Sequence, residues 1–193
     1  MVAHAAPELE ALNDPILERR TGERLNVGIH SDLVNQTKKY KADLYEFSLS
    51  MTQWRKFKTR YKLNWEKARF AEDSHALIPK ERGIYAFTVE LNPSKLPSHG
   101  YILYVGITGD TSSATLHSRY AQYAANLRKE DGRPAVFFML KNWSGDLFFN
   151  YAPLSDTSID LGKMERALLS AIIPPVNKRD IEATITAARA AAF

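Results

Sequence analysis

Hydrophobic and polar positions divide this chain of 193 residues into two parts with different patterns. Residues 1–78 are polar and contain few β-branched runs, which favours helices. After Pro79 the pattern changes, and runs rich in β-branched and aromatic residues follow at 84–91 and 101–107, with a stretch containing Pro, Ser and Gly between them. This arrangement predicts two antiparallel strands joined by a long loop.

The second part continues with one helical pattern and two further apolar runs. Residues 116–128 predict a helix, and the runs 135–141 and 147–154 predict a second pair of strands around a turn at 142–146. The helix is expected to bury an apolar side formed by Leu116, Tyr120, Tyr123 and Leu127.

Two more helices are expected towards the end of the chain. One of residues 156–158, all with capping side chains, begins a helix that runs to Ile173, where a double proline ends it, and the alanine-rich tail from Asp180 predicts a short closing helix. The sequence therefore predicts an α/β fold of the α+β kind. A small, mostly antiparallel sheet flanked by helices is expected over 79–193, after an N-terminal helical extension over 1–78.

Within the first part, residues 50–70 show the sharpest helical pattern. Four aromatic residues recur at helical spacing on one side: Trp54, Phe57, Tyr61 and Trp65. The ordinary interpretation is an amphipathic helix that packs its aromatic side and leaves its cations in solvent. The functional alternative is that these cations contact nucleic-acid phosphates, and the residues concerned are Arg55, Lys56, Lys58, Arg60 and Lys62.

Composition narrows the classes of protein that fit this pattern. A formal net charge of +4 permits a polyanionic partner without requiring one. The chain has no cysteine, which excludes disulfide bonds, thiolate zinc sites and cysteine nucleophiles, and makes a reducing cytoplasm the expected compartment. Residues 1–8 lack the basic and apolar regions of a signal peptide, and no segment has the length and apolarity of a membrane span, so we expect no membrane partner.

Residues with candidate chemistry follow one another in a definite order in the second part. The two predicted strands carry the triplets Gly83-Ile84-Tyr85 and Tyr104-Val105-Gly106. Four polar residues then follow in the order Arg119, Tyr123, Glu165 and Asn177. Each of them has an ordinary structural explanation when taken alone. Together they include the carboxylate that a hard cation prefers and the arginine that matches a phosphate, which are groups that phosphodiester hydrolysis uses.

In this order the residues resemble the motifs of the GIY-YIG nuclease family, over about residues 82–177. Val105 stands in place of the middle isoleucine of the second triplet, which is a conservative variant. The resemblance implies a small α/β domain that hydrolyses DNA with one Mg²⁺ or Mn²⁺ ion per active site. Gly83 and Gly106 are expected to allow a close approach of backbone or substrate.

The resemblance also implies roles for individual side chains. Glu165 would bind the divalent metal, and Arg119 would hold the scissile phosphate and stabilise its developing charge. Tyr85 would activate or orient the attacking water, with Tyr104 and Tyr123 completing its hydrogen-bond network. Tyr104 is the alternative base. Because a free tyrosine has a pKa near 10, either base would need a lowered pKa.

Three further residues complete the candidate site. Asn177 would fix the site through side-chain hydrogen bonds without touching the reacting atoms. Arg128 is the alternative to Arg119, because the stretch between Gly106 and this helix is long. His117 is expected to be a surface residue, with a substrate contact as the alternative.

The type of nuclease follows from what is attached to the motif region. Structure-specific resolvases of the family carry a cysteine-rich zinc module, which a chain without cysteine cannot form. The short tail after Asn177 favours a compact, restriction-type endonuclease that acts as a homodimer on a near-palindromic site, with the 1–78 extension used for DNA binding or dimerisation. The alternatives are a less specific or single-strand-acting nuclease of a defence or DNA-processing system, and a nucleic-acid-binding protein of this fold that does not cleave.

Overall fold

The computed structural model describes residues 47–91 and 99–177. By its contacts the chain forms two compact units, Met1–Leu44 and Tyr45–Phe193, and all the described residues belong to the second unit. The helices expected before residue 47 and from Asp180 onwards lie outside the described residues.

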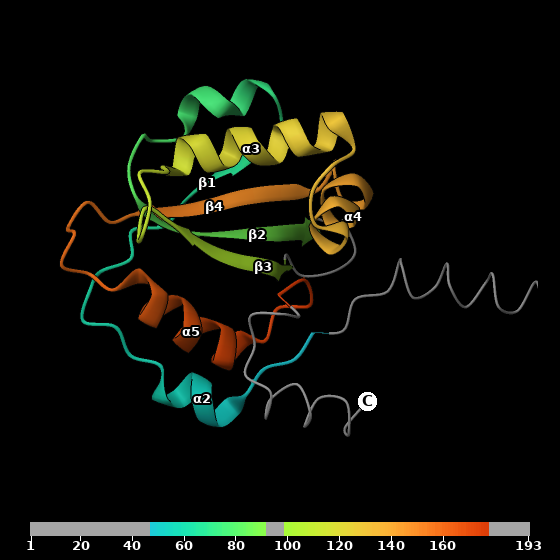
Figure 1. The fold of residues 1–193 in the computed structure, drawn as a ribbon. Helices are drawn as coiled ribbons and strands as arrows, with labels where there is room; N and C mark the ends of the chain where they lie inside the picture. Colours follow the sequence, from blue (N-terminus) through green and yellow to red (C-terminus); the bar gives the residue numbers. More distant parts are fainter. Residues whose placement is uncertain (1–46, 92–98, 178–193) are drawn as a thin grey trace, which may run out of the picture. The chain divides into compact units, whose positions relative to one another are not determined.

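A four-stranded antiparallel sheet forms the centre of the described unit (Figure 1). Its strands are β1 (Glu66–Arg69), β2 (Gly83–Leu91), β3 (His99–Thr108) and β4 (Leu147–Pro153), in the spatial order β1-β4-β2-β3. The β2–β3 pair is the hairpin that the sequence predicts, and β4 pairs with β2 on its other side. The expected small antiparallel sheet flanked by helices is thus confirmed.

Helices cover the two faces of this sheet. Figure 1 shows α3 (Leu116–Lys129) on one face and α5 (Leu161–Ile172) on the other, and α4 (Pro134–Asn142) contributes to the same core as α3. Side chains of a strand point alternately to the two faces. Ile84 therefore lies in the core beneath α5, whereas its neighbour Tyr85 lies in the core beneath α3.

Helix α3 follows directly from its sequence. Thr115 caps it in a capping box, in which its side chain accepts from the N–H of Ser118 and the Ser118 side chain accepts from the N–H of Thr115. The helix buries Leu116, Tyr120 and Tyr123, as their spacing predicts. These contacts fix which side of α3 faces the sheet.

The segment that contains residues 135–141 is a helix, so the strand predicted there is wrong. Pro134 stands in the first turn of α4, where the missing N–H costs nothing, and the buried residues Val136, Met139 and Leu140 recur at helical spacing. Valine and two phenylalanines favour a strand locally, but burial against α3 and the sheet outweighs that preference.

The long basic helix predicted over residues 50–70 is also wrong. Only α2 (Met51–Lys56) is helical, and residues 57–65 have no regular secondary structure before β1 begins. From Phe57 to Asn64, half-buried and exposed residues alternate strictly, which is the period of an extended chain. The aromatic residues are three or four residues apart, which fits one face of a helix. A spacing of four residues also places two of them on the inner side of the extended segment, so the two patterns cannot be told apart from spacing alone.

The aromatic residues of this region therefore do not form one packed face. Phe57 and Tyr61 pack against the core beneath α5, but Trp54 and Trp65 are 47% and 43% exposed. The 3₁₀ helix η1 (Asp73–Leu77) then connects β1 to β2.

The predicted domain boundary between residues 78 and 79 is corrected by β1. This strand pairs with β4 from Glu66 to Arg69, so residues before 79 are part of the sheet, and the division between the two units falls at Leu44/Tyr45. The cap of α5 is Asp160, which accepts from the N–H of Lys163, and not one of residues 156–158. Among the described helices, none has the length and apolarity to span a membrane.

Candidate active site

Three tyrosines from three elements meet on the α3 side of the sheet. Tyr85 comes from β2, Tyr104 from β3 and Tyr123 from α3, and all three are buried. The hydroxyls of Tyr85 and Tyr123 are hydrogen-bonded at 2.9 Å. The ring centroid of Tyr104 lies 6.2 Å from the ring centroid of Tyr85 and 6.4 Å from that of Tyr123. The structure thus brings together the three tyrosines that the sequence singles out, which we call the tyrosine cluster.

Gly106 makes room for the cluster. It is the register partner of Tyr85 across the β2–β3 hairpin, and a Cβ at position 106 would lie 2.5 Å from the Tyr85 hydroxyl oxygen and 3.1 Å from the Tyr104 ring. Real Cβ atoms essentially never make a contact as short as the first, and the second is tighter than most. The second glycine of the sequence motif is therefore required by the position of the Tyr85 ring.

We expect Gly106→Ala to lower the free energy of unfolding by about 1–3 kcal/mol, because the added methyl overpacks a core position. Urea denaturation of the two proteins measures the difference. Gly145→Ala is the matched control, since a Cβ there meets nothing within 4 Å, and its effect should stay within about 0.5 kcal/mol. Equal stability of Gly106→Ala and wild type would show that the Tyr85 ring is not held where the structure places it.

Arg119 lies one helical turn before Tyr123 on α3 and is half-buried. Its Nη1 donates to Gln122 Oε1 at 2.7 Å. Its Nε is buried and has no hydrogen-bond partner among the described residues. A buried N–H of a guanidinium costs free energy when it is unpaired, so this atom is a candidate for binding an anion brought by a substrate.

Burial controls the protonation of the cluster. It raises the pKa of Tyr85 well above its ordinary value of 10, and the neighbouring Tyr123 and Tyr104 raise it further, whereas the charge of Arg119 lowers it. Burial also raises the pKa of Tyr123, and the charge of Arg119 again opposes the shift. Both hydroxyls are therefore protonated at neutral pH and act as hydrogen-bonding groups. As the pH falls from neutral their protonation does not change.

Arg133 is a member of the site that sequence reasoning missed. Its Nη2 donates to the Tyr104 hydroxyl at 2.6 Å, and its guanidinium carbon lies 5.4 Å from the centroid of the Tyr104 ring. Arg133 is the N-cap residue of α4. Because the sequence predicted a strand after it, no pattern pointed from this residue to the cluster. Tyr104 thus has a cationic partner, whereas Tyr85 is paired with another hydroxyl.

Asn177 acts on the backbone between Tyr104 and Gly106. Its Nδ2 donates to the carbonyl oxygen of Val105 at 2.8 Å, and its Oδ1 accepts from the Val105 N–H at 2.9 Å. The adjacent Val176 N–H donates to Leu103 O at 3.1 Å. Asn177 is 1% exposed, so these bonds pair the outer backbone groups of β3 away from solvent. Asn177 thus holds the strand that carries the second motif.

Glu165 occupies the other layer of the molecule. It is half-buried on α5, whose buried residues Leu161, Met164 and Leu168 pack against the opposite face of the sheet. The structure therefore assembles the tyrosines with Arg119 and places the predicted metal ligand on the helix across the sheet.

The described residues contain no group of three or more His, Cys, Asp or Glu side chains that could hold a metal ion. One carboxylate is still compatible with Mg²⁺, which commonly keeps several waters and binds through one or two carboxylates and substrate phosphates. A single carboxylate such as Glu165 is thus compatible with an ion that arrives with the substrate, whereas the described part of the chain offers no enclosed metal site.

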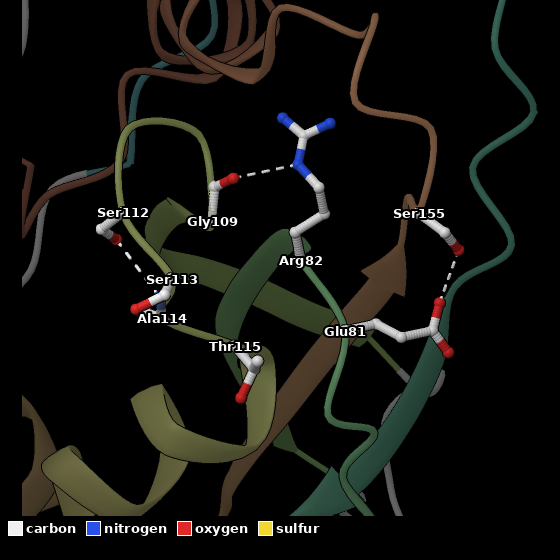
Figure 2. A pocket seen from close by; sticks show the side chains of 8 residues that line it. All are labelled: Glu81, Arg82, Gly109, Ser112, Ser113, Ala114, Thr115 and Ser155. Atoms are coloured by element: carbon white, nitrogen blue, oxygen red, sulfur yellow. Dashed lines mark hydrogen bonds between the residues drawn. The ribbon is translucent and has the colours of Figure 1, made fainter.

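The loop between β3 and Arg119 is held from one side by Arg82 (Figure 2). Arg82 Nε donates to Gly109 O at 3.0 Å, and its Nη2 is ion-paired with Asp110 at 3.2 Å. A pocket of about 300 Å³ lies beside this loop, between Ser112 to Thr115 and Glu81. The first N–H groups of α3 are already paired with backbone carbonyls, Leu116 with Glu81 O at 2.8 Å. These hydrogen bonds fix where α3 begins, and the pocket beside them gives no evidence of a ligand site.

The remaining candidates lie away from the cluster. Arg128 is exposed and ion-paired with Glu72 at 3.0 Å, so the structure favours Arg119 over it. His117 packs against His75 with ring centroids 3.8 Å apart and the rings tilted by 32°, and it is half-buried. The five cations of the predicted nucleic-acid surface are exposed at the end of α2 and along the segment that follows it: Arg55, Lys56, Lys58, Arg60 and Lys62.

Comparisons of this chain with protein-family models, with curated proteins and with solved structures found no match.

Proposed function

We propose that this protein is a metal-dependent DNA endonuclease. The observation that carries the proposal is the tyrosine cluster beside Arg119, whose buried Nε has no partner in the described structure. A fixed guanidinium next to protonated hydroxyls is suited to bind a phosphodiester and to stabilise charge that develops on it. The motif order of the sequence supports the same activity by its resemblance to GIY-YIG nucleases.

In this proposal Arg119 binds the scissile phosphate, and the tyrosines orient the attacking water. Tyr85 and Tyr123 are poor bases at neutral pH because burial raises the pKa of each. Tyr104, the alternative base from the sequence, has its hydroxyl held by a hydrogen bond from Arg133. Mg²⁺ or Mn²⁺, one ion per active site, would supply further charge stabilisation through Glu165.

The test is a cleavage assay on plasmid and phage DNA with wild type and Glu165→Gln, each with Mg²⁺ or with EDTA. We expect cleavage by wild type only with the metal, and a loss of at least about 100-fold in the variant. Glu72→Gln replaces an exposed glutamate in the other layer and should cleave like wild type. Cleavage that survives both EDTA and Glu165→Gln would contradict the metal role of Glu165.

The pattern of products separates the kinds of nuclease. We propose a restriction-type enzyme, which yields discrete bands, and a homodimer, because a site that cuts one strand needs a second copy to cut both. The absence of cysteine suits action in the reducing cytoplasm. A smear of products, or preference for single strands, would indicate the less specific defence or DNA-processing nuclease instead.

The position of Glu165 favours a second candidate function. Because this carboxylate is carried by the layer opposite the tyrosine cluster, the same fold could bind nucleic acid without cutting it. Binding of duplex or single-stranded DNA without cleavage, in both Mg²⁺ and Mn²⁺, would support that function and reject the enzyme.

A further inference from the structure

A second candidate site lies on the α5 side of the sheet. A pocket of about 610 Å³ opens between the segment that follows α2 and the first half of α5. Phe57, Tyr61 and Met164 are among its lining residues, together with the cations Lys58, Arg60 and Lys163. The pocket therefore combines aromatic and apolar walls with a positively charged rim.

The alternation of residues 57–64 explains how one short segment supplies both kinds of wall. Phe57, Thr59 and Tyr61 are half-buried and turn inward, whereas Lys58, Arg60 and Lys62 are exposed. Neighbouring cations in this row are two residues apart, which is at most about 7 Å along an extended chain. The row is thus a regular line of positive charge that borders an aromatic pocket.

Two aromatic rings that line the pocket are contacted by neighbouring side chains. The Arg60 guanidinium lies 5.2 Å from the centroid of Tyr61, and Trp54 stacks on Phe57 with centroids 6.3 Å apart at an interplanar angle of 10°. The acidic group at the pocket is Asp160, whose Oδ1 already accepts from the N–H of Lys163 at 2.7 Å to cap α5. The carboxylate of Asp160 interacts with the positive N-terminal end of α5, and three cations of the rim face this one anion. The rim as a whole therefore favours an anionic ligand.

We propose that this pocket takes one unpaired nucleotide of a nucleic-acid substrate. The base stacks on Tyr61 or Phe57, and the flanking phosphates contact Lys58, Arg60 and Lys163. Proteins that bind single strands combine these two elements, a positively charged track and aromatic faces. The inference rests on the proposed nucleic-acid substrate but not on cleavage, because the pocket and the tyrosine cluster lie on opposite faces of the sheet.

Wild-type protein in EDTA provides the first test. We expect a fluorescein-labelled dT12 oligonucleotide to bind about tenfold more tightly than the same oligomer made of abasic units, because stacking needs the bases whereas the phosphates are common to both. Fluorescence anisotropy at fixed salt measures both affinities. Equal affinities would overturn the nucleotide pocket and leave a row of cations that attracts any polyanion.

A pocket-filling variant provides the second test. Ala167 is exposed and lines the pocket, so Ala167→Trp should occupy the space of the base without removing a charge. We expect about tenfold weaker binding of dT12 and no change for the abasic oligomer. Ala76→Trp, at an exposed position of η1, is the control for the added ring.

The outcomes separate this inference from the proposed function. Unchanged dT12 binding by Ala167→Trp overturns the pocket even if plasmid DNA is cleaved. Selective weakening of dT12 binding supports the pocket even if no DNA is cleaved. No binding of dT12 by wild type overturns the inference outright, while duplex cleavage would still be open to measurement.

Discussion

Arg119→Ala is expected to reduce DNA cleavage by about 1,000-fold while the protein stays folded. Removal of one fixed donor to a developing negative charge costs about 10²–10³ in rate, and an arginine on a transferring phosphoryl group costs as much or more. Arg119 is half-buried on α3, and its one side-chain hydrogen bond among the described residues goes to Gln122. Its replacement therefore removes little of the packing that holds α3.

The buried Nε makes this prediction specific to arginine. Lysine keeps the positive charge but has no Nε–H and no planar fork, so Arg119→Lys should recover only part of the lost rate. Initial rates of plasmid cleavage in Mg²⁺ measure the three proteins, and urea denaturation confirms that each is folded. DNA binding should weaken much less than the rate falls.

Arg128→Ala is the matched control, because Arg128 lies on the same helix and was the alternative from the sequence. Its side chain is exposed and paired with Glu72, and exposed pairs contribute about 0–1 kcal/mol. We expect wild-type cleavage from this variant. If Arg128→Ala lost the activity and Arg119→Ala kept it, the tyrosine cluster would not be the catalytic centre.

The parts of the fold that sequence predicted correctly are those with one consistent local pattern. The β2–β3 hairpin and α3 have matching periodicity, caps and burial, so local preference and tertiary packing agree. The extended segment from Phe57 was predicted wrongly because its aromatic spacing fits a helix as well as an alternating chain. α4 was predicted wrongly because its β-favouring residues are buried at helical spacing.

The candidate site shows the same division. Tyr85, Tyr104 and Tyr123 were grouped through the resemblance to the GIY-YIG motifs, and the elements that carry them are ones the local pattern predicted correctly. Arg133 could not be grouped with them, since its contact with Tyr104 depends on where α4 begins relative to β3, a long-range relation with no local signal. The layer that carries Glu165 was likewise not determined by the helical pattern around it.

Asn177→Ala is expected to lower the free energy of unfolding by about 3 kcal/mol. The substitution leaves both the N–H and the carbonyl of Val105 without their side-chain partner at a position sealed from solvent. Each buried backbone group left unpaired costs about 1–3 kcal/mol. Urea denaturation measures the loss, and Asn142→Ala, at an exposed position, should change stability by less than about 0.5 kcal/mol. A loss below 1 kcal/mol would mean that the two hydrogen bonds do not hold β3.

The variant Asn177→Asp tests the donor half of this bridge by its pH dependence. An ionised carboxylate still accepts from the Val105 N–H, but its other oxygen faces the Val105 carbonyl and repels it. Burial and this repulsion raise the pKa of the introduced carboxyl in the folded state above its unfolded value of about 4. The protonated carboxyl can donate to the carbonyl, so the variant should be most stable, relative to Asn177→Ala, below pH 4. This advantage should disappear as the pH rises through the raised folded-state pKa.

Because Val105 lies between Tyr104 and Gly106, cleavage by the variant should fall over the same pH range, which would connect the edge of β3 to the geometry of the tyrosine cluster.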